Sequence, residues 1–177
     1  MTSQTSTPTT IGNKEQYYRQ YIYHLSKAFW KAIEDDWDNL LKYTNLSIHE
    51  YTILTFLNAN GNLTISALAQ LGLMHISTAQ NASHKLQKAN YLTLQKSTID
   101  KRTTYATITD KGRKILGDIE QKWDKTDSTL FEKTTNMSQF FGQEPDFREV
   151  AILLKSYYGE SLFSQMILEE ESLATGA

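Results

Sequence analysis

Residues 64–109, TISALAQLGLMHISTAQNASHKLQKANYLTLQKSTIDKRTTYATIT, are the stretch that decides the fold. The first half of it contains two segments with apolar residues at helical spacing, 65–71 and about 75–89, separated by Gly72. Thr64 stands at the position of a helix N-cap, where its hydroxyl can accept a hydrogen bond from the first turn. The pattern therefore predicts two helices joined by a tight turn at Gly72. The inner face of the second helix is predicted to consist of Ile76, Ala79, Ala82 or Ser83, and Leu86.

The second half of the stretch has the pattern of a β-hairpin. The runs 91–96 and 103–108 are rich in Thr, Tyr and aliphatic residues, as strands are, and a polar segment joins them. The charged triplet Asp100-Lys101-Arg102 lies in that segment, at the predicted tip. A helix pair followed by a hairpin predicts a winged helix-turn-helix. Such a module can place its second helix in the DNA major groove and its wing on the backbone or the minor groove.

The segments around this stretch are predicted to be helical as well. Apolar residues recur every three or four positions over 14–43, which predicts one long helix. Ser47-Ile48-His49-Glu50 is a capping box and predicts a helix that ends at Asn60-Gly61. After the hairpin, Thr109 is expected to cap a long helix that runs through Leu130.

The complete pattern predicts a mainly α-helical fold with one small β-hairpin wing. A final helix is expected over 146–173. The terminal helices carry many apolar side chains, which only each other and a second copy of the chain can bury, so a homodimer is expected. The predicted organisation is a disordered tail over 1–13, an N-terminal dimerisation helix over 14–45, a winged helix-turn-helix domain over 46–110, and C-terminal dimerisation helices over 111–177. The predicted dimerisation residues are Tyr18, Ile22, Leu25, Phe29, Trp123, Tyr157 and Phe163.

Charge is distributed unevenly along the chain of 177 residues, whose net charge is −2. Between Tyr51 and Gly117 there are eight basic and two acidic residues, a net charge of +6, whereas the remainder carries −8. A basic module in an acidic remainder is typical of a protein whose functional face meets a polyanion.

Several other function classes have little support in the sequence. There are no cysteines, which excludes disulfides and thiolate metal sites. The four histidines have no metal-ligand spacing, and the sequence has no phosphate-binding glycine loop and no nucleophile elbow, so no metal, no cofactor and no enzymatic activity are expected. The acidic run Glu34-Asp35-Asp36 is interpreted as a solvated helix face. Without a signal-peptide pattern or a membrane-spanning segment, a cytoplasmic protein with no membrane partner is expected.

The order of these motifs resembles that of the MarR family of dimeric winged-helix transcription regulators. Asp100-Lys101-Arg102 matches the Asp-x-Arg motif of the family's wing, and Ile108-Thr109-Asp110-Lys111-Gly112 matches the start of its post-wing helix. Leu86 with Tyr91-Leu92 matches the entry to the wing. Within the family the chain is most similar to the Hpr type, the repressors of extracellular protease production and sporulation in bacilli. Residues 25–31, Asp36-Trp37 and the run 72–79 with Asn81 carry that similarity.

The predicted partner is double-stranded DNA, bound by a homodimer that acts as a repressor. Side chains near the N-terminus of the second helix of a helix-turn-helix point at base edges. The predicted base-contacting residues are His75, Ser77, Thr78, Gln80 and Asn81. The predicted backbone contacts are Thr64, Ser66, His84, Lys85 and Lys88. The wing residues are Asp100, Lys101 and Arg102, with Arg102 expected in a minor groove. The resemblance implies that Asp100 orients Arg102 by an ion pair.

Two alternatives remain open at this point. The basic face could dock an acidic protein rather than DNA. The aromatic stripe between Tyr17 and Trp37 could line a pocket for a small-molecule effector at the dimer junction, although burial in the dimer core is the simpler interpretation.

The absence of arginine among the predicted base-contacting residues weakly favours A·T-rich sites over guanine readout.

Overall fold

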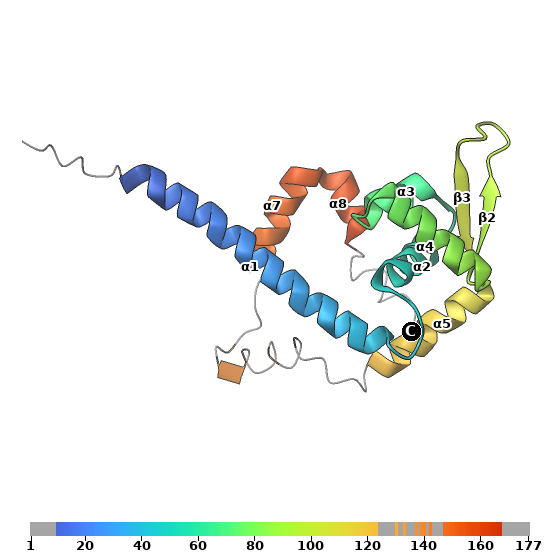
Figure 1. Cartoon of the computed structure of the whole chain (residues 1–177), viewed down its shortest axis with the longest axis horizontal. Helices are drawn as coiled ribbons and strands as arrows, with labels where there is room; N and C mark the ends of the chain where they lie inside the picture. The colour runs from blue at the N-terminus through green and yellow to red at the C-terminus, as the bar shows by residue number, and fades with distance from the viewer. Residues whose placement is uncertain are drawn as a thin grey trace, which may run out of the picture.

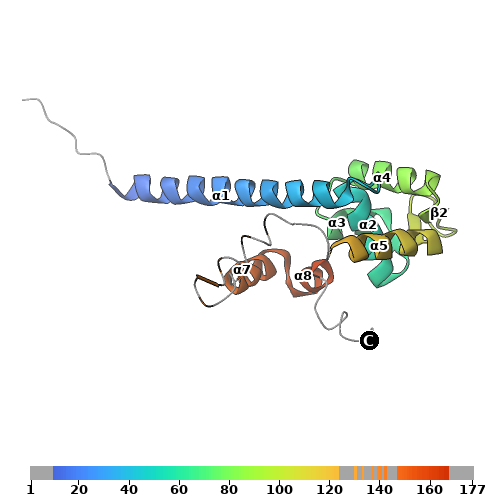
Figure 2. The same ribbon diagram turned by 90° about the horizontal axis from the view of Figure 1, so that it is seen from below.

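A computed structural model of the chain describes residues 10–123, 130, 133, 137, 139–140, 142 and 147–167. The molecule consists of a winged-helix body at one end and a long helix, α1 (Thr10–Leu41), that projects from it (Figure 1). Seen from below, α1 continues well past the body (Figure 2). The helix begins at Thr10, so the expectation that residues 10–13 belong to a disordered tail is wrong for these four residues.

Only the C-terminal end of α1 packs into the body. Leu40 and Leu41 are buried there, and the rings of Trp37 and Tyr51 lie 4.7 Å apart. Burial raises the pKa of the Tyr51 hydroxyl. The part of α1 between Tyr17 and Trp30 presents its large apolar and aromatic side chains to solvent, including the four predicted dimerisation residues on this helix, Tyr18, Ile22, Leu25 and Phe29.

The capping box predicts the start of α2 (Ile48–Asn60) correctly. The Glu50 carboxylate accepts a hydrogen bond from the Ser47 backbone N–H at 2.7 Å, and the Ser47 hydroxyl accepts one from the Glu50 N–H at 3.3 Å. Gly61 ends the helix in the left-handed region, with φ of 76°, as expected for a C-cap glycine. Ile53, Leu54 and Leu57 of α2 are fully buried and form the centre of the core.

A three-stranded antiparallel sheet, with the order β1-β3-β2, carries the wing. Strands β2 (Leu92–Lys96) and β3 (Thr104–Ile108) form the predicted hairpin, with Leu92 opposite Ile108 and Lys96 opposite Thr104. Strand β1 (Leu63–Thr64) was not predicted, because a strand of two residues is too short to show an alternation of apolar and polar residues. It pairs with the outer side of β3 and ties the start of the helix pair to the wing.

The helix pair consists of α3 (Ile65–Leu71) and α4 (Ile76–Lys88). Thr64 caps α3 as predicted, accepting a hydrogen bond from the Ala67 N–H at 3.1 Å. The turn begins at Gly72 as predicted, and its left-handed residue is Leu73, with φ of 48°, whereas φ of Gly72 is −83°. Gly72 is needed for space instead: a Cβ there would lie 2.5 Å from the Met74 methyl and 3.1 Å from the Leu68 carbonyl oxygen.

The inner face of α4 is close to the predicted one, with one exception. Ala79, Ala82, Ser83 and Leu86 are buried as predicted. The prediction that Ile76 belongs to this face is wrong, because 46% of the residue is exposed. Ile76 is the first residue of α4, and its side chain faces the wing and not α2.

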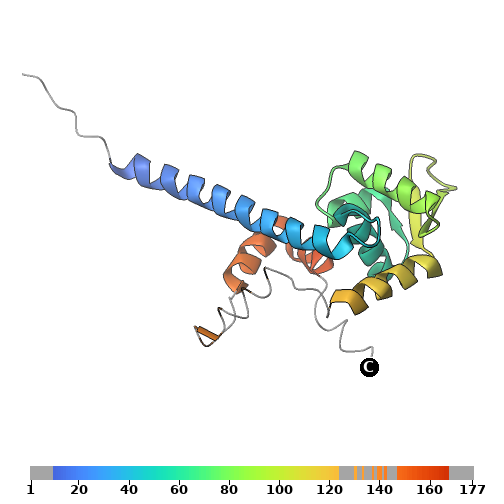
Figure 3. The same cartoon turned by 60° about the horizontal axis from the view of Figure 1, so that its bottom comes forward.

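Helix α5 (Asp110–Trp123) begins where the sequence predicts. The Thr109 hydroxyl accepts a hydrogen bond from the Gly112 N–H at 3.1 Å and donates to the Asn90 and Tyr91 carbonyl oxygens, which ties α5 to the end of α4. Figure 3 shows α4 and α5 on either side of α2. The helix ends at Trp123; the predicted continuation over 124–129 lies outside the described residues.

The C-terminal segment forms two helices in place of the predicted single one. Helices α7 (Arg148–Tyr158) and α8 (Glu160–Met166) are separated by Gly159, whose φ of 83° and ψ of 150° interrupt the helix. Leu162 and Met166 of α8 pack against the core of the body, and the ring of Phe147 lies 5.5 Å from that of Phe29 on α1. Among the predicted dimerisation residues here, Tyr157 is 80% exposed and Phe163 is partly buried. The side chain of Trp123 and residues 168–173 lie outside the described part of the chain.

Within the described residues, no helix is long and apolar enough to cross a membrane. The same residues contain no group of three or more side chains that could hold a metal ion.

Candidate nucleic-acid interface

Three elements of the helix-turn-helix and its wing meet around one open cleft on the surface of the body. The cleft is lined by Thr64, Ile65 and Ser66 at the start of α3, by Ile76, Gln80 and His84 on α4, and by Leu94, Arg102, Thr103 and Thr104 on the wing. Five of the predicted DNA-contacting residues lie here, although they come from positions as far apart in the sequence as 64 and 102. In the ribbon, α4 and the wing stand side by side at the end of the molecule away from α1 (Figure 1).

The N-terminus of α4 is capped by His75. Its Nδ1 atom accepts a hydrogen bond from the Ser77 backbone N–H at 3.3 Å and lies 2.7 Å from the Ser77 hydroxyl oxygen. Both residues are exposed, so both remain at the surface where base contacts were predicted. Part of their hydrogen-bonding capacity is used in shaping the helix end, a role that the sequence pattern did not indicate.

The other predicted base-contacting residues differ in exposure. Gln80 and Asn81 are exposed on α4, whereas Thr78 is partly buried, which makes it the least accessible of the five. Of the five predicted base-contacting residues, Gln80 is the one that lines the cleft beside the wing. An amide side chain there can donate to and accept from the same adenine edge.

The predicted backbone contacts fall in three places. The hydroxyl oxygens of Thr64 and Ser66 lie 3.0 Å apart at the N-terminus of α3. His84 lines the cleft, and Lys88 is exposed at the end of α4.

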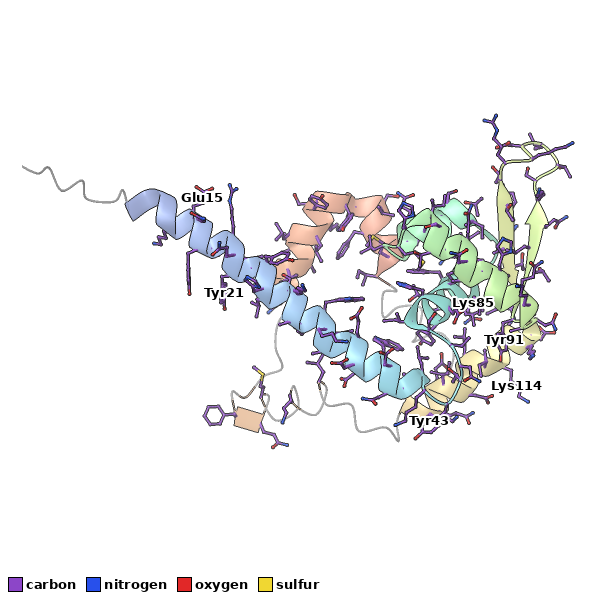
Figure 4. The ribbon with its side chains drawn as sticks, viewed as in Figure 1. Glu15, Tyr21, Tyr43, Lys85, Tyr91 and Lys114 are labelled. Atoms are coloured by element: carbon purple, nitrogen blue, oxygen red, sulfur yellow. The ribbon has the colours of Figure 1, made fainter. Side chains whose placement is uncertain are left out.

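Lys85 lies on the opposite side of α4, toward α2 (Figure 4). Its Nζ is 3.7 Å from Oε1 of Glu50, the buried carboxylate of the capping box. The structure therefore separates Lys85 from the cleft that holds His84.

Asp100 organises the tip of the wing through the backbone. Its carboxylate accepts hydrogen bonds from the Arg102 N–H at 3.0 Å and from the Thr103 hydroxyl at 2.9 Å, while its carbonyl oxygen accepts from the Thr103 N–H at 2.9 Å. This is a β-turn with aspartate in its first position, where the side chain favours the turn. The implied ion pair with the Arg102 guanidinium is wrong for this structure: among the described contacts Asp100 has none.

The basic residues of the module are not equivalent. Lys111 donates to the Ala89 carbonyl oxygen at 2.9 Å, where it caps α4, and its Nζ lies 4.9 Å from the centre of the Tyr91 ring. Arg113 pairs with Asp110 at 3.8 Å. In the described part of the chain, the following basic residues have no ion-pair partner: Lys88, Lys96, Lys101, Arg102 and Lys114. All of these except Lys114 lie on α4 and the wing, and Arg102 lines the cleft.

Two residues of the acidic run on α1 make contacts within the helix, and the third makes a contact with a distant residue. The Glu34 carboxylate accepts a hydrogen bond from the Trp30 indole at 2.9 Å, Asp35 pairs with Lys31 at 2.8 Å, and Asp36 accepts from the Leu130 N–H at 2.9 Å. Asp35 is exposed, as expected for a solvated helix face, whereas Glu34 and Asp36 are partly buried. The aromatic stripe on α1 is largely exposed and is well separated from the cleft, as the position of Tyr21 in Figure 4 illustrates.

Comparison with known proteins identifies relatives of the whole arrangement. A model of the MarR family matches residues 46–104. The chain is 38% identical over 143 residues to the HTH-type transcriptional regulator Hpr of Bacillus cereus, which covers 81% of this chain and 77% of the relative. The Hpr regulator of Exiguobacterium sibiricum is 34% identical over 165 residues, covering 90% and 87%.

Solved structures with the same fold include two proteins of low sequence identity, the transcriptional regulator BldR and AbfR. BldR from Sulfolobus solfataricus superposes with a TM-score of 0.60 at 18% identity and covers 83% of this chain and 98% of its own. Reduced AbfR bound to DNA superposes with a TM-score of 0.61 at 14% identity and covers 75% and 99%. These two likenesses concern the fold.

Proposed function

We propose that this chain, which belongs to the MarR family of DNA-binding transcriptional regulators and is not an enzyme, acts as a homodimeric repressor that reads pseudo-palindromic promoter sites. The observation that carries the proposal is the cleft in which α3, α4 and the wing bring Thr64, Gln80 and Arg102 together next to unpaired cations. Polar groups on a recognition helix, with cations on a wing beside it, suit a DNA duplex better than an acidic protein surface.

The residues divide into two roles in this proposal. His75, Ser77, Gln80 and Asn81 choose the sequence, with Thr78 contributing less because it is partly buried. Cations hold the duplex: Lys88 on α4, and Lys101 and Arg102 at the wing tip, where guanidinium is attracted to a narrow minor groove. Lys85 contributes less to this grip than the sequence suggested, because Glu50 is its nearest counter-charge.

A second copy of the chain is proposed to cover the exposed apolar residues of α1 and of the C-terminal helices. Tyr18, Ile22 and Leu25 on α1, with Tyr157 on α7, are all exposed in one copy. Contiguous exposed apolar surface of this kind marks an interface. In a two-fold dimer, two α4 helices would enter successive major grooves, about 34 Å apart.

The targets are proposed to be promoters of protease or stationary-phase genes, as the resemblance to the Hpr type implies, and occupation of the promoter would repress them. A cytoplasmic location goes with this proposal, because such a regulator acts on chromosomal DNA. Genomic footprinting of the bound protein identifies the targets directly.

The proposal is tested by selecting DNA fragments from a random-sequence pool with the full chain. We expect enrichment of an inverted repeat, a mass of two chains in light scattering, and an affinity that falls steeply as salt rises, because phosphate contacts release counterions. Failure to enrich any sequence, or a salt-independent affinity, would overturn it.

A further inference from the structure

The apolar side chain of Ile76 lines the cleft between α4 and the wing, at the edge of the core, where Ile65 and Leu94 are its apolar neighbours in the lining. The core side of α4 consists of Ala79, Ala82, Ser83 and Leu86, all buried. Ile76 lies outside that group and is 46% exposed. Burial in the core therefore does not account for an isoleucine at this position.

Ile76 belongs instead to the stripe of α4 that faces the wing. Residues four apart lie one above the other on a helix, and Ile76, Gln80 and His84 all line the cleft. Across from them stand Arg102 and Thr103 of the wing. The stripe thus presents an apolar group, an amide and an imidazole in sequence, starting at the N-terminal end of the recognition helix.

This order of groups has a specific chemical complement in the major groove. An amide such as Gln80 pairs with the N6 and N7 atoms of adenine, and the only apolar group that a base pair offers in that groove is the C5 methyl of thymine. Positions 76 and 80 are four residues apart, a rise of about 6.0 Å along the helix, which exceeds one base-pair step of about 3.4 Å and stays below two. The two side chains can therefore contact neighbouring base pairs.

We propose that Ile76 is a specificity-determining residue that packs against the C5 methyl of a thymine adjacent to the base pair read by Gln80. The β-branched side chain suits this role because only one χ1 rotamer is strongly favoured in a helix, so little freedom is lost on contact. The inference deepens the proposed function and rests on it. The contact between Ile76 and the thymine methyl would give a direct preference for A·T pairs, in addition to any effect of minor-groove width at the wing.

The test removes only the methyl group from the DNA. In the fragment enriched by the full chain, each thymine is replaced in turn by uracil, which keeps its Watson–Crick edge and loses the C5 methyl. We expect the parent protein to lose about fourfold in affinity for each methyl group removed, the worth of one buried methyl-sized group, and so about fifteenfold when one thymine is replaced in each half-site. Ile76→Ala should bind the parent fragment more weakly and show no further loss at that thymine, whereas Ile76→Val should keep the effect.

Two controls separate this contact from general damage. Ser77→Ala alters the neighbouring exposed residue and should lower the affinity equally for thymine and uracil DNA. Circular dichroism of each variant shows whether the fold is retained, and the comparison of paired affinities cancels any uniform loss.

The outcomes are distinct from those that test the proposed function. Enrichment of a defined sequence with no sensitivity to any uracil replacement would overturn the role of Ile76 and leave the proposed function standing. Sensitivity that persists in Ile76→Ala would assign the methyl to another side chain and overturn it as well. If no sequence is enriched, the proposed function itself fails, and the inference fails with it.

Discussion

The carboxylate of Asp100 accepts a hydrogen bond from the backbone N–H of Arg102 at 3.0 Å, two residues further along the wing. The aspartate thus fixes the course of the backbone at the tip and leaves the Arg102 guanidinium unpaired within the described chain. In this arrangement the charge of the arginine is available to a ligand, because the Asp100 carboxylate is occupied by the turn.

The first prediction concerns that turn. Asp100→Ala removes the acceptor for the Arg102 N–H and the Thr103 hydroxyl. We expect the affinity for DNA to fall about fivefold to tenfold, because the wing tip loses its fixed shape, while stability changes by no more than about 1 kcal/mol at this exposed site. Fluorescence anisotropy and thermal melts measure the two effects.

Asp100→Asn is the matched control for that change, because its amide oxygen can still accept from the backbone. It should retain most of the affinity of the parent. If asparagine were as damaging as alanine, the charge of Asp100 would matter more than the turn, and the role assigned to its hydrogen bonds would be incorrect.

A second prediction concerns the close contact between α5 and the entry to the wing. A Cβ on Gly112 would lie 2.2 Å from the Tyr91 carbonyl oxygen. Gly112→Ala therefore has to displace backbone, and we expect a loss of about 2–4 kcal/mol in the free energy of unfolding. Urea denaturation of the protein at fixed concentration measures this loss.

Gly117 on the same helix provides the comparison, since nothing lies within 4 Å of a Cβ built there. Gly117→Ala should stabilise the protein by about 0.5–1 kcal/mol through its higher helix propensity. Equal effects of the two substitutions would show that the contact with Tyr91 is not what requires glycine at position 112.

The third prediction concerns the buried hydroxyl on the inner face of α4. Ser83 is completely buried, and its Oγ has no hydrogen-bond partner among the described residues. Ser83→Ala removes an unsatisfied polar atom, so we expect the free energy of unfolding to stay the same or to rise by about 1 kcal/mol. A clear loss of stability, measured in the same urea experiment, would mean that the hydroxyl is satisfied in solution.

The features that the sequence predicts best are those set by residues close together in the chain. The capping box of Ser47 and Glu50, the cap at Thr64 and the hairpin from Leu92 to Ile108 each depend on local spacing, and each is confirmed. The family and its DNA-binding role were also predictable, because the motifs at the wing tip and at Thr109 to Gly112 are contiguous.

The features that escaped prediction depend on contacts between distant residues. Strand β1 exists because Leu63 and Thr64 pair with β3, some forty residues later. Lys85 meets Glu50 of α2, which no spacing within α4 reveals. Ile76 was assigned to the core by helical periodicity, but the first turn of α4 lies at the edge of that face, where the wing and not α2 is the neighbour. The apolar periodicity continues across Gly159 and therefore predicted one helix, whereas the positive φ of Gly159 ends α7 there.

The most direct test of the cleft as the DNA-binding surface compares Arg102→Ala with Lys114→Ala on the enriched DNA fragment. Both residues are exposed cations with no ion pair among the described residues, but Arg102 lines the cleft and Lys114 lies on α5, outside the cleft lining (Figure 4). We expect Arg102→Ala to lower the affinity about tenfold or more and to reduce the salt slope by about one, without unfolding the protein, and Lys114→Ala to change the affinity by less than about twofold. Unchanged binding by Arg102→Ala, or an equal loss in both variants, would contradict the account.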